Sequence, residues 1–224
     1  RKGPVLRYLS PREKRSRRAK GARVALFIFG AFALLSLLDI PLLHIFYHKP
    51  LQHIEYHDWY RLLRIMGYMG TWIIVGSVYI AHDRNRHRGL AIFFSALISG
   101  AFAELTKLIV ARERPVINSD IQPGWYHFRG FFSGFSDGSN LGFPSSHTAV
   151  AFGGCLMLAC FLPKANRLLL MLAVGCGITR MLTGAHFATD VFGGALLGWG
   201  SARMMCYFAG AHVEGLRPKY RMPF

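Results

Sequence analysis

The sequence predicts an all-α protein, a six-helix transmembrane bundle whose functional site lies at the outer, extracytoplasmic face of the membrane. Of the 224 residues, 52% are hydrophobic and the mean hydropathy is +0.28, which is too apolar for an ordinary soluble domain. The apolar residues fall in long runs, a pattern typical of helices that cross a bilayer. Basic residues gather at alternate ends of these runs, which indicates one orientation in the membrane.

Six apolar runs are each close to the ~20 residues that an α-helix needs to cross the hydrocarbon core. Backbone groups in lipid must hydrogen-bond within their own segment, so each run is expected to be a helix. The predicted spans are Val24–Phe46, Ile65–Ala81, Gly89–Ala111, Ser146–Leu162, Leu168–Thr183 and Phe187–Ala209.

Charge in the loops predicts the orientation. With the N-terminus placed in the cytoplasm, 19 of the 27 Lys and Arg residues lie in cytoplasmic segments, and every cytoplasmic turn contributes to the excess. Cytoplasmic loops are enriched in basic residues, so both termini are expected inside the cell. The ends of spans three and five and the starts of spans four and six then share the outer face.

The predicted organisation is one membrane domain with two tails. Residues 1–23 form a basic cytoplasmic tail, residues 24–210 the six-span domain, and residues 211–224 a C-terminal cytoplasmic tail. The basic cluster before an apolar span suits anionic lipid better than nucleic acid, so no nucleic acid partner is expected. Two longer outer loops are predicted at about 47–64 and 115–144. The second is rich in aromatic residues and is either a lid that meets lipid or an interfacial belt.

The first polar group lies at the outer end of span three and runs from Lys107 to Arg114-Pro115. Seven residues cover about two helical turns, so both basic side chains are expected on nearly the same face. Pro115 disfavours helical backbone at Arg114, so the chain should turn there. The two cations either hold one phosphate or extend separately to the membrane interface. Glu104, one turn before Lys107, is placed to pair with it.

The second group, Pro144-Ser145-Ser146-His147, opens span four. Ser145 is predicted to cap the helix. The unpaired amides and the positive end of the helix dipole favour an anion at this position. His147 follows in the first turn, where it is either structural or adjacent to such an anion.

The third group surrounds the outer turn between spans five and six. His186 and Asp190 are four residues apart, so they share a helix face if span six begins early enough. Asp190 would then bind one imidazole nitrogen and leave the other free to attack. Gly184 is expected to supply the turn that brings Arg180 back toward them.

The predicted topology places all three groups on the same membrane face. Three basic side chains, two histidines, a carboxylate and a helix N-terminus would then surround one anion. This combination suits phosphoryl transfer, in which stabilising charge on the equatorial oxygens does most of the work.

These residues resemble the type 2 phosphatidic acid phosphatases, the PAP2 family, whose pattern is K-x6-RP, then PSGH, then SR-x5-H-x3-D. This chain reads Lys107-x6-Arg114-Pro115, Pro144-Ser145-Ser146-His147 and Thr179-Arg180-x5-His186-x3-Asp190, in the same order and with the same internal spacing. Two positions depart from the pattern. Thr179 replaces Ser but keeps a hydroxyl, whereas Ser146 replaces Gly and adds a side chain beside the expected phosphate.

The resemblance implies a role for each matching residue. His186 would attack phosphorus and form a phosphohistidine, with Asp190 orienting it. His147 would protonate the leaving oxygen. The side chains implied to hold the phosphate oxygens, helped by the Ser146 amide, are Lys107, Arg114, Ser145 and Arg180. The resemblance implies no metal and no other cofactor.

The expected function is therefore hydrolysis of a phosphate monoester or diphosphate on a lipid, in an integral membrane protein of a bacterial inner membrane or another cell membrane. A water-soluble substrate would not require six spans. Phosphotransfer to another lipid or sugar, or a non-catalytic lipid carrier, are the alternatives. The expected partners are the lipid phosphate and the bilayer, and the sequence leaves the exact lipid and the oligomeric state open.

Overall fold

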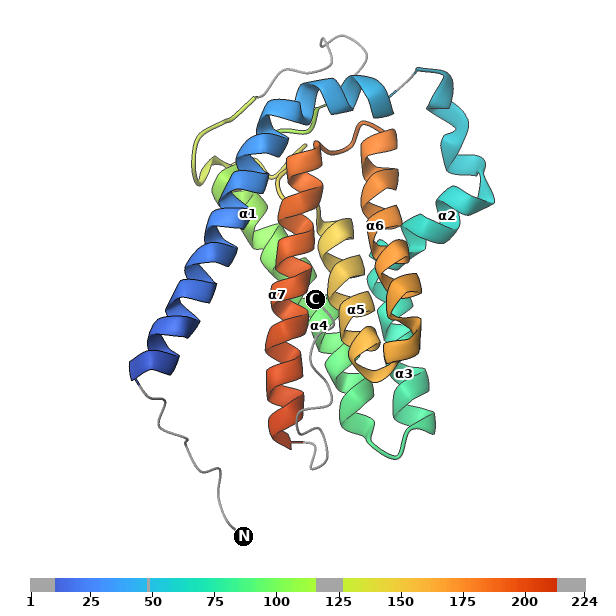
Figure 1. Cartoon of the computed structure of the whole chain (residues 1–224). Coiled ribbons are helices and arrows are strands. Elements are labelled where there is room, and N and C mark those ends of the chain that lie inside the picture. The colour runs from blue at the N-terminus through green and yellow to red at the C-terminus, as the bar shows by residue number, and fades with distance from the viewer. Residues whose placement is uncertain (1–10, 48, 116–126, 213–224) are drawn as a thin grey trace. The chain divides into compact units, whose positions relative to one another are not determined.

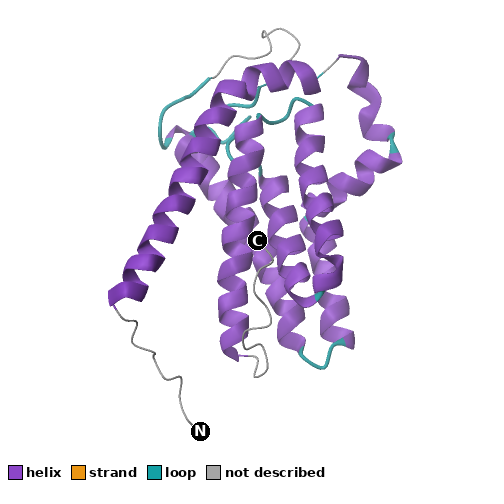
Figure 2. Cartoon of the chain, in the orientation of Figure 1, coloured by secondary structure: helices purple, strands orange, loops and turns teal. Residues whose placement is uncertain are grey.

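The computed structural model describes residues 11–47, 49–115 and 127–212 (Figure 1). The chain divides into two units, residues 1–37 and 38–224, and all the candidate site residues belong to the second unit. Within the described ranges the regular structure is helical, apart from two isolated bridges that join loop residues (Figure 2). The prediction of an all-α fold is confirmed.

The described part of the chain consists of α-helices and a few short 3₁₀ helices, and one α-helix corresponds to each predicted span. The described elements are α1 (Pro11–Phe46), η1 (Lys49–Tyr56), α2 (Asp58–Arg64), η2 (Ile65–Gly67), α3 (Met69–His82), α4 (Arg86–Val110), η3 (Ser133–Phe135), α5 (Ser146–Phe161), η4 (Pro163–Ala165), α6 (Asn166–Leu182) and α7 (Ala188–His212).

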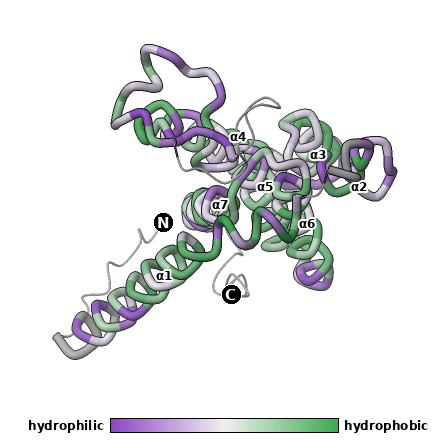
Figure 3. The backbone as a smooth tube through the Cα atoms, turned by 90° about the horizontal axis from the view of Figure 1, so that it is seen from above, coloured by the Kyte–Doolittle hydropathy of each residue, from purple (hydrophilic) through white to green (hydrophobic). Residues whose placement is uncertain are grey.

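Three helical segments are long and apolar enough to cross a membrane: Arg18–Phe46, Arg86–Val110 and Pro163–Leu182. A fourth joins them if Asp58–Gly67 and Met69–His82, which meet at a bend of 72°, count as one span. Six as the number of spans, and their orientation, stay predictions. Hydrophobic residues predominate along the helices (Figure 3), and large apolar side chains face outward, as Ile74 and Met171 do on α3 and α6. A helix that contacts lipid presents such a surface.

The second span begins later than the sequence predicts. The expected span starts at Ile65, but residues 65–67 form η2 and the continuous helix starts only at Met69. Gly67 lets this segment approach the first turn of α5 closely, because an added Cβ would meet the His147 Cβ at 2.8 Å. This close approach brings the end of α2 to the region of His147.

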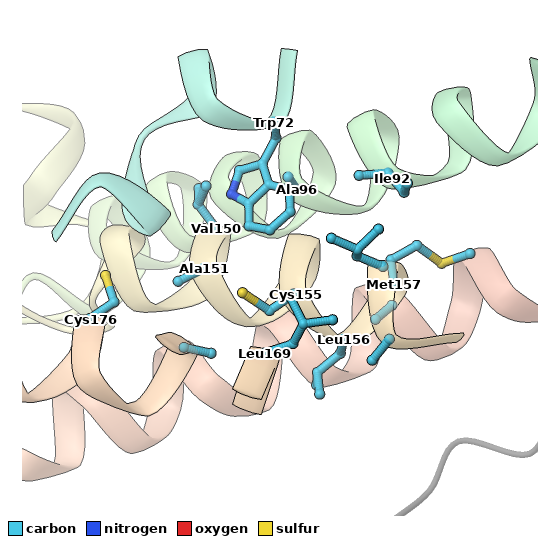
Figure 4. Packing of buried hydrophobic residues seen from close by; sticks show 14 of the residues in the cluster. Trp72, Ile92, Ala96, Val150, Ala151, Cys155, Leu156, Met157, Leu169 and Cys176 are labelled. Atoms are coloured by element: carbon cyan, nitrogen blue, oxygen red, sulfur yellow. The ribbon is translucent and has the colours of Figure 1, made fainter. Parts of the chain in front are cut away.

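Helix α5 lies at the centre of the second unit, where it packs against α4, α6 and α7, while α3 packs on α4. The Trp72 ring of α3 lies over α5 (Figure 4), and Gly154 beneath it leaves room for the indole. On α7, Gly194 and Gly198 lie against the backbone of α5. Small residues of this kind let helices approach closely, and close packing stabilises bundles in lipid.

Helix α4 ends earlier than the sequence analysis assumed. Its last residue is Val110, and Ala111 adopts a left-handed conformation with φ of 51° while its N–H donates to the Lys107 carbonyl at 2.8 Å. The expectation that Lys107 and Arg114 share a helix face is therefore wrong, since Arg114 lies beyond the helix. The left-handed cap turns the chain back, so Arg114 approaches Lys107 through the loop.

Candidate active site

The three sequence motifs meet at one cavity of about 560 Å³ in the second unit. Six of the eight predicted site residues contribute to its lining, namely Lys107, Arg114, Ser146, His147, Arg180 and His186. The remaining wall is largely apolar and includes Met69, Leu97 and Val150. The cavity thus combines a cationic end with a hydrophobic side.

Ser145 and Asp190 lie behind the lining. Ser145 is fully buried, and its Oγ accepts a hydrogen bond from the Thr148 amide at 3.4 Å, so the predicted helix cap is present. Its own N–H donates to the Asp190 carbonyl at 2.9 Å. The start of α5 is therefore tied to the start of α7. The Ser145 hydroxyl faces its own helix here, which leaves its predicted contact with phosphate without support from this geometry.

His186 lies in the turn between α6 and α7, only 2% exposed, with Nδ1 3.5 Å from Asp190 Oδ2. Helix α7 begins at Ala188, so the two residues do not share a helix face as expected. Asp190 instead reaches back over the helix start, where Oδ2 accepts the Phe187 N–H at 2.9 Å. Gly184, with φ of 65°, supplies the predicted turn. Nδ1 of the imidazole faces Asp190 without a hydrogen bond to it, which leaves Nε2 on the other side of the ring.

The protonation state of His186 follows from its surroundings. Burial is the main influence and lowers its pKa below the ordinary value, and the nearby cations Arg180 and Arg114 act in the same direction. The Asp190 carboxylate opposes them but does not outweigh them. The neutral imidazole, which is the form able to attack an electrophile, is therefore favoured near neutral pH.

Several donors in the cavity wall have no hydrogen-bond partner among the described residues. They are Nε and Nη1 of Arg180 and Nε2 of His147, all buried. The His147 ring lies edge-on to Tyr68, with the ring centres 5.1 Å apart. Buried polar groups in proteins are nearly always paired, so donors left unpaired at a cavity indicate a site for an anionic ligand.

The opposite wall of the cavity holds a triad that sequence analysis foresaw only in part. Lys107 Nζ donates to Glu104 Oε1 at 2.9 Å and also contacts the Ser146 hydroxyl, which itself donates to Glu104 at 2.5 Å. The predicted pairing of Glu104 with Lys107 is confirmed. Ser146, the departure from the family pattern, lies between the two charges. The Glu104 side chain is 64% exposed, so an incoming anion can replace it as the partner of Lys107.

Sequence analysis missed the residues that hold Asp190. Arg112 Nη2 contacts Asp190 Oδ1 and donates to Thr189 Oγ1 at 2.8 Å, while its Nη1 lies 3.7 Å from Asp39 Oδ2. Asp39, fully buried, accepts the Thr189 N–H at 2.8 Å. A carboxylate within an apolar span is costly and usually paired, which was the one available signal for Asp39. Arg112 had been counted only as an outer-loop charge.

The loop after α4 is organised by a second charge network. Arg129 contacts Glu113 and donates to Asp137 Oδ2 at 2.8 Å. Burial raises the pKa of Glu113, but hydrogen bonds from Arg129 and His127 outweigh it and hold that pKa low. The aromatic side chains carried by this loop are exposed, as Phe131 is at 68%. Trp125 and Tyr126 of the predicted loop lie outside the described residues, and the choice between lid and belt stays open.

In the described ranges, no three His, Cys, Asp or Glu side chains lie close enough together to hold a metal ion. The charge in the cavity comes instead from lysine and arginine, which do not ligate metals but bind phosphate well.

Comparison with known proteins bears on this cavity. The sequence model of the PAP2 superfamily matches residues 88–214, more than half of the chain. The chain is 32% identical over 122 residues to a lipid A 1-phosphatase of Rhizobium johnstonii, an alignment covering 54% of this chain and 48% of that protein. It is 40% identical over 67 residues to the bacitracin transport permease protein BcrC of Bacillus licheniformis, covering 30% of this chain and 33% of that protein.

The chain thus spans about half the length, or less, of the curated relatives it matches. Its fold resembles the crystal structure of a transmembrane PAP2 type phosphatidylglycerolphosphate phosphatase from Bacillus subtilis. The TM-score is 0.53 and the identity 18%, with 83% of this chain and 98% of that chain covered. The three motifs, the helical fold and the sequence match agree, and the chain belongs to the PAP2 superfamily.

Proposed function

We propose that this protein is a membrane lipid phosphatase that hydrolyses a phosphate monoester or diphosphate through a phosphohistidine intermediate, without a metal. The observation that carries the proposal is the cavity itself. Lys107, Arg114 and Arg180 surround its polar end together with both histidines, while Leu97, Val150 and Met69 line its apolar side. A lipid that carries a phosphate has the same division between charge and hydrocarbon.

In the first step, His186 Nε2 attacks phosphorus while Asp190 stabilises the positive charge that develops on the imidazole. Lys107, Arg114 and Arg180 stabilise the equatorial oxygens, whose charge dominates this transition state. His147 gives a proton to the leaving oxygen. In the second step, water attacks the phosphohistidine and releases phosphate, restoring the free imidazole.

Metal independence in this mechanism follows from the charge supplied by the chain. Lys107, Arg114 and Arg180 all line the cavity, and their charges are enough to neutralise the oxygens of a phosphate dianion without a divalent ion. The names of the relatives suggest which lipids to test first, namely a lipid A 1-phosphate and phosphatidylglycerol phosphate.

The first experiment is phosphate release by the purified protein in detergent with EDTA, over a panel of lipid phosphates and diphosphates. His186→Ala is expected to reduce turnover by roughly 10⁴-fold or more. His87→Ala is the matched control, because His87 is exposed at the start of α4, at the end of that helix opposite Lys107. Release that depends on His186 and survives EDTA supports the mechanism. Release that EDTA abolishes would overturn its metal-free part.

Two other readings predict different results in the same assay. A phosphotransferase would release no phosphate but would transfer it to an added acceptor lipid. A non-catalytic carrier would bind the lipid and turn nothing over in either condition. Folded protein that shows one of these behaviours would replace the hydrolase proposal.

The proposed location of the site is the extracytoplasmic face, with both termini in the cytoplasm. Labelling with a membrane-impermeant maleimide tests it. Ser136→Cys, exposed on the loop before α5, should react in intact spheroplasts. Arg84→Cys, exposed between α3 and α4, should react only after lysis. The reverse pattern would place the site inside the cell.

A further inference from the structure

Arg64 is a further basic side chain in the cavity wall and belongs to none of the three motifs. It is the last residue of α2 and lines the cavity together with Lys107 and Arg180. It also lines a neighbouring cavity of about 420 Å³. Tyr68 is the other residue that the two cavities share. Arg64 and Tyr68 therefore lie between the active-site cavity and this second cavity.

The position of Arg64 is fixed by its surroundings. The guanidinium carbon lies 5.9 Å from the ring centre of Tyr60 and 5.6 Å from that of Tyr68. The next residues are anchored as well: Trp72 Nε1 donates to the Met66 carbonyl at 2.8 Å, and Gly67 lies against His147. A cation held between two aromatic rings on an anchored turn is prepared to bind an anion without large reordering.

The charge of Arg64, whose side chain is 29% exposed, is less compensated than that of Lys107. Its carboxylate partner is Glu55 at 3.8 Å, and the Glu55 side chain is 51% exposed. Its Nε has no hydrogen-bond partner among the described residues. Lys107 differs, because Glu104 binds it at 2.9 Å. Arg64 therefore keeps most of its capacity to bind an anionic group of the ligand.

Arg64 also lies on the side of the cavity where the leaving group is expected. Tyr68 contacts both the Arg64 guanidinium and the His147 ring, at 5.6 Å and 5.1 Å between centres. In the proposed mechanism His147 protonates the leaving oxygen, so the leaving group lies on this side. An alcohol leaving group is neutral once protonated and gains little from another cation. A phosphate leaving group stays anionic and gains much.

We propose that Arg64 binds a second phosphate of the substrate, and that the preferred substrates are lipid diphosphates. This inference rests on the proposed function, and it identifies the side chain that binds the leaving group. The distal phosphate occupies the cradle of Lys107, Arg114 and Arg180, and the proximal phosphate lies at Arg64. The lipid chain then extends along the apolar wall of the cavity.

The reaction is balanced. The bond from His186 Nε2 to the distal phosphorus forms as the bond from that phosphorus to the bridging oxygen breaks. The bridging oxygen keeps the electron pair, remains on the proximal phosphate and takes the proton of His147. Water then displaces His186 from phosphorus and returns a proton to His147. The products are a lipid monophosphate and inorganic phosphate.

The kinetic test compares a polyprenyl diphosphate with the monophosphate of the same polyprenol. We expect Arg64→Gln to lower the ratio of their kcat/KM values by about 100-fold, the usual cost of losing one charge-stabilising donor. Arg64→Lys should restore part of the ratio, since it keeps the charge without the planar fork. Arg86→Gln is the matched control, because Arg86 is exposed at the first residue of α4, at the end of that helix opposite Lys107.

A third substrate identifies the source of the second phosphate. Phosphatidylglycerol phosphate carries a phosphodiester separated from its terminal phosphate by glycerol. If Arg64→Gln impairs this lipid and spares the diphosphate, the directly linked arrangement is wrong. If Arg64→Gln lowers kcat/KM equally for both polyprenyl substrates, Arg64 helps to bind the transferred phosphate. The inference is then overturned, while the proposed function stands.

A binding measurement tests the subsite without turnover. In His186→Ala protein, inorganic pyrophosphate should bind more tightly than orthophosphate by calorimetry, and adding Arg64→Gln should remove the difference. Equal affinities for the two anions in the His186→Ala protein would refute the subsite. If the wild-type protein turns over no lipid while pyrophosphate still binds more tightly than orthophosphate, the result counts against the proposed function alone.

Discussion

Two groups of charges, one behind the cavity lining and one in it, are solvated in different ways. On the α7 side, Asp190 and Asp39 are fully buried and Arg112 lies between them. On the α4 side, Lys107 meets Glu104, whose side chain is 64% exposed. A buried network resists change because an unpaired charge there is costly. Glu104 can leave Lys107 with little loss, because its carboxylate is already largely exposed and water solvates it when it is released.

This difference suits two separate tasks. In the proposed mechanism a nucleophile must stay oriented through every cycle, and the buried group contains Asp190, which lies beside His186. In the same mechanism a phosphate must enter and leave, and the present partner of Lys107 is the exposed Glu104 carboxylate, which a phosphate resembles in charge. The following variants test how each of the two groups of charges responds to the loss of one member, from the largest expected effect to the smallest.

Asp190→Asn should have the largest effect, lowering kcat by about 10³-fold, because the imidazole loses the carboxylate that orients it and stabilises its charge. It should also move the acid limb of kcat/KM. Burial already lowers the pKa of His186 while Asp190 raises it, so removing the carboxylate lowers it further. Activity falls where the imidazole becomes protonated, so the limb should shift to lower pH in the variant.

The wild-type profile gives the reference for that shift. Its acid limb, measured as kcat/KM against pH with a substrate whose ionisation is known, should lie below 6.5, the ordinary value for histidine. An acid limb above 6.5 assigned to His186 would contradict the burial argument.

Arg112→Gln should lower kcat by about 100-fold with a smaller change in KM, since it releases Asp190 without touching the substrate. It should also destabilise the protein by about 3–5 kcal/mol, because Asp39 and Asp190 stay buried after losing this cation. Thermal unfolding in detergent measures the second effect. The double variant Arg112→Gln with Asp39→Asn should recover part of the stability, and strictly additive losses would argue against coupling between the two residues.

The acid limb adds a readout that a purely structural role for Arg112 would not move. Removing this cation leaves the Asp190 charge less balanced, which raises the pKa of His186. The limb should therefore move upward, opposite to its movement in Asp190→Asn. An unchanged limb would restrict Arg112 to holding the fold.

Glu104→Gln tests the pair of Lys107 with the exposed Glu104 carboxylate. Removing the carboxylate frees Lys107 for phosphate, so KM should fall about 3- to 10-fold, the scale of a partly exposed ion pair, with little change in kcat. Steady-state kinetics at two salt concentrations measures it, and the effect should shrink as salt rises. A drop of 100-fold in kcat would mean that Glu104 takes part in the chemistry.

Ser146→Gly restores the usual family residue and should have the smallest effect, within about threefold in kcat/KM. Loss of the hydroxyl removes one contact with Lys107 and one with Glu104, but the pairing of those two side chains at 2.9 Å remains. Kinetics over the lipid panel would show whether the serine narrows the range of substrates. A uniform loss on every lipid would assign it to phosphate binding.

Residue spacing was enough to find most of the cavity. Lys107, Arg114, Ser146, His147, Arg180 and His186 were identified from three short motifs, and all six line it. Local rules failed where the chain turns. The helical spacing assumed from Lys107 to Arg114 was wrong, because the left-handed residue Ala111 ends α4 at Val110. The helix predicted from Ile65 starts only at Met69, after the 3₁₀ turn in which Gly67 lies against α5.

The residues that only the fold could reveal are far from these motifs in sequence. Asp39 reaches Thr189 across 150 positions, and Arg112 reaches Asp190 across 78. Arg64 lies in an outer segment that the sequence described only by its charge. No periodicity or motif links such pairs, because their proximity arises from contacts between segments far apart in the chain, such as those of α4 with α7.

By itself, the sequence determined the all-α class, the family and the chemical types that gather in the cavity, because apolar runs and short motifs are properties of neighbouring residues. Tertiary structure decided which charges are buried and paired, which are open to exchange, and which stay available to a ligand. Those properties depend on desolvation and on distances between segments. They exist only after the helices pack together.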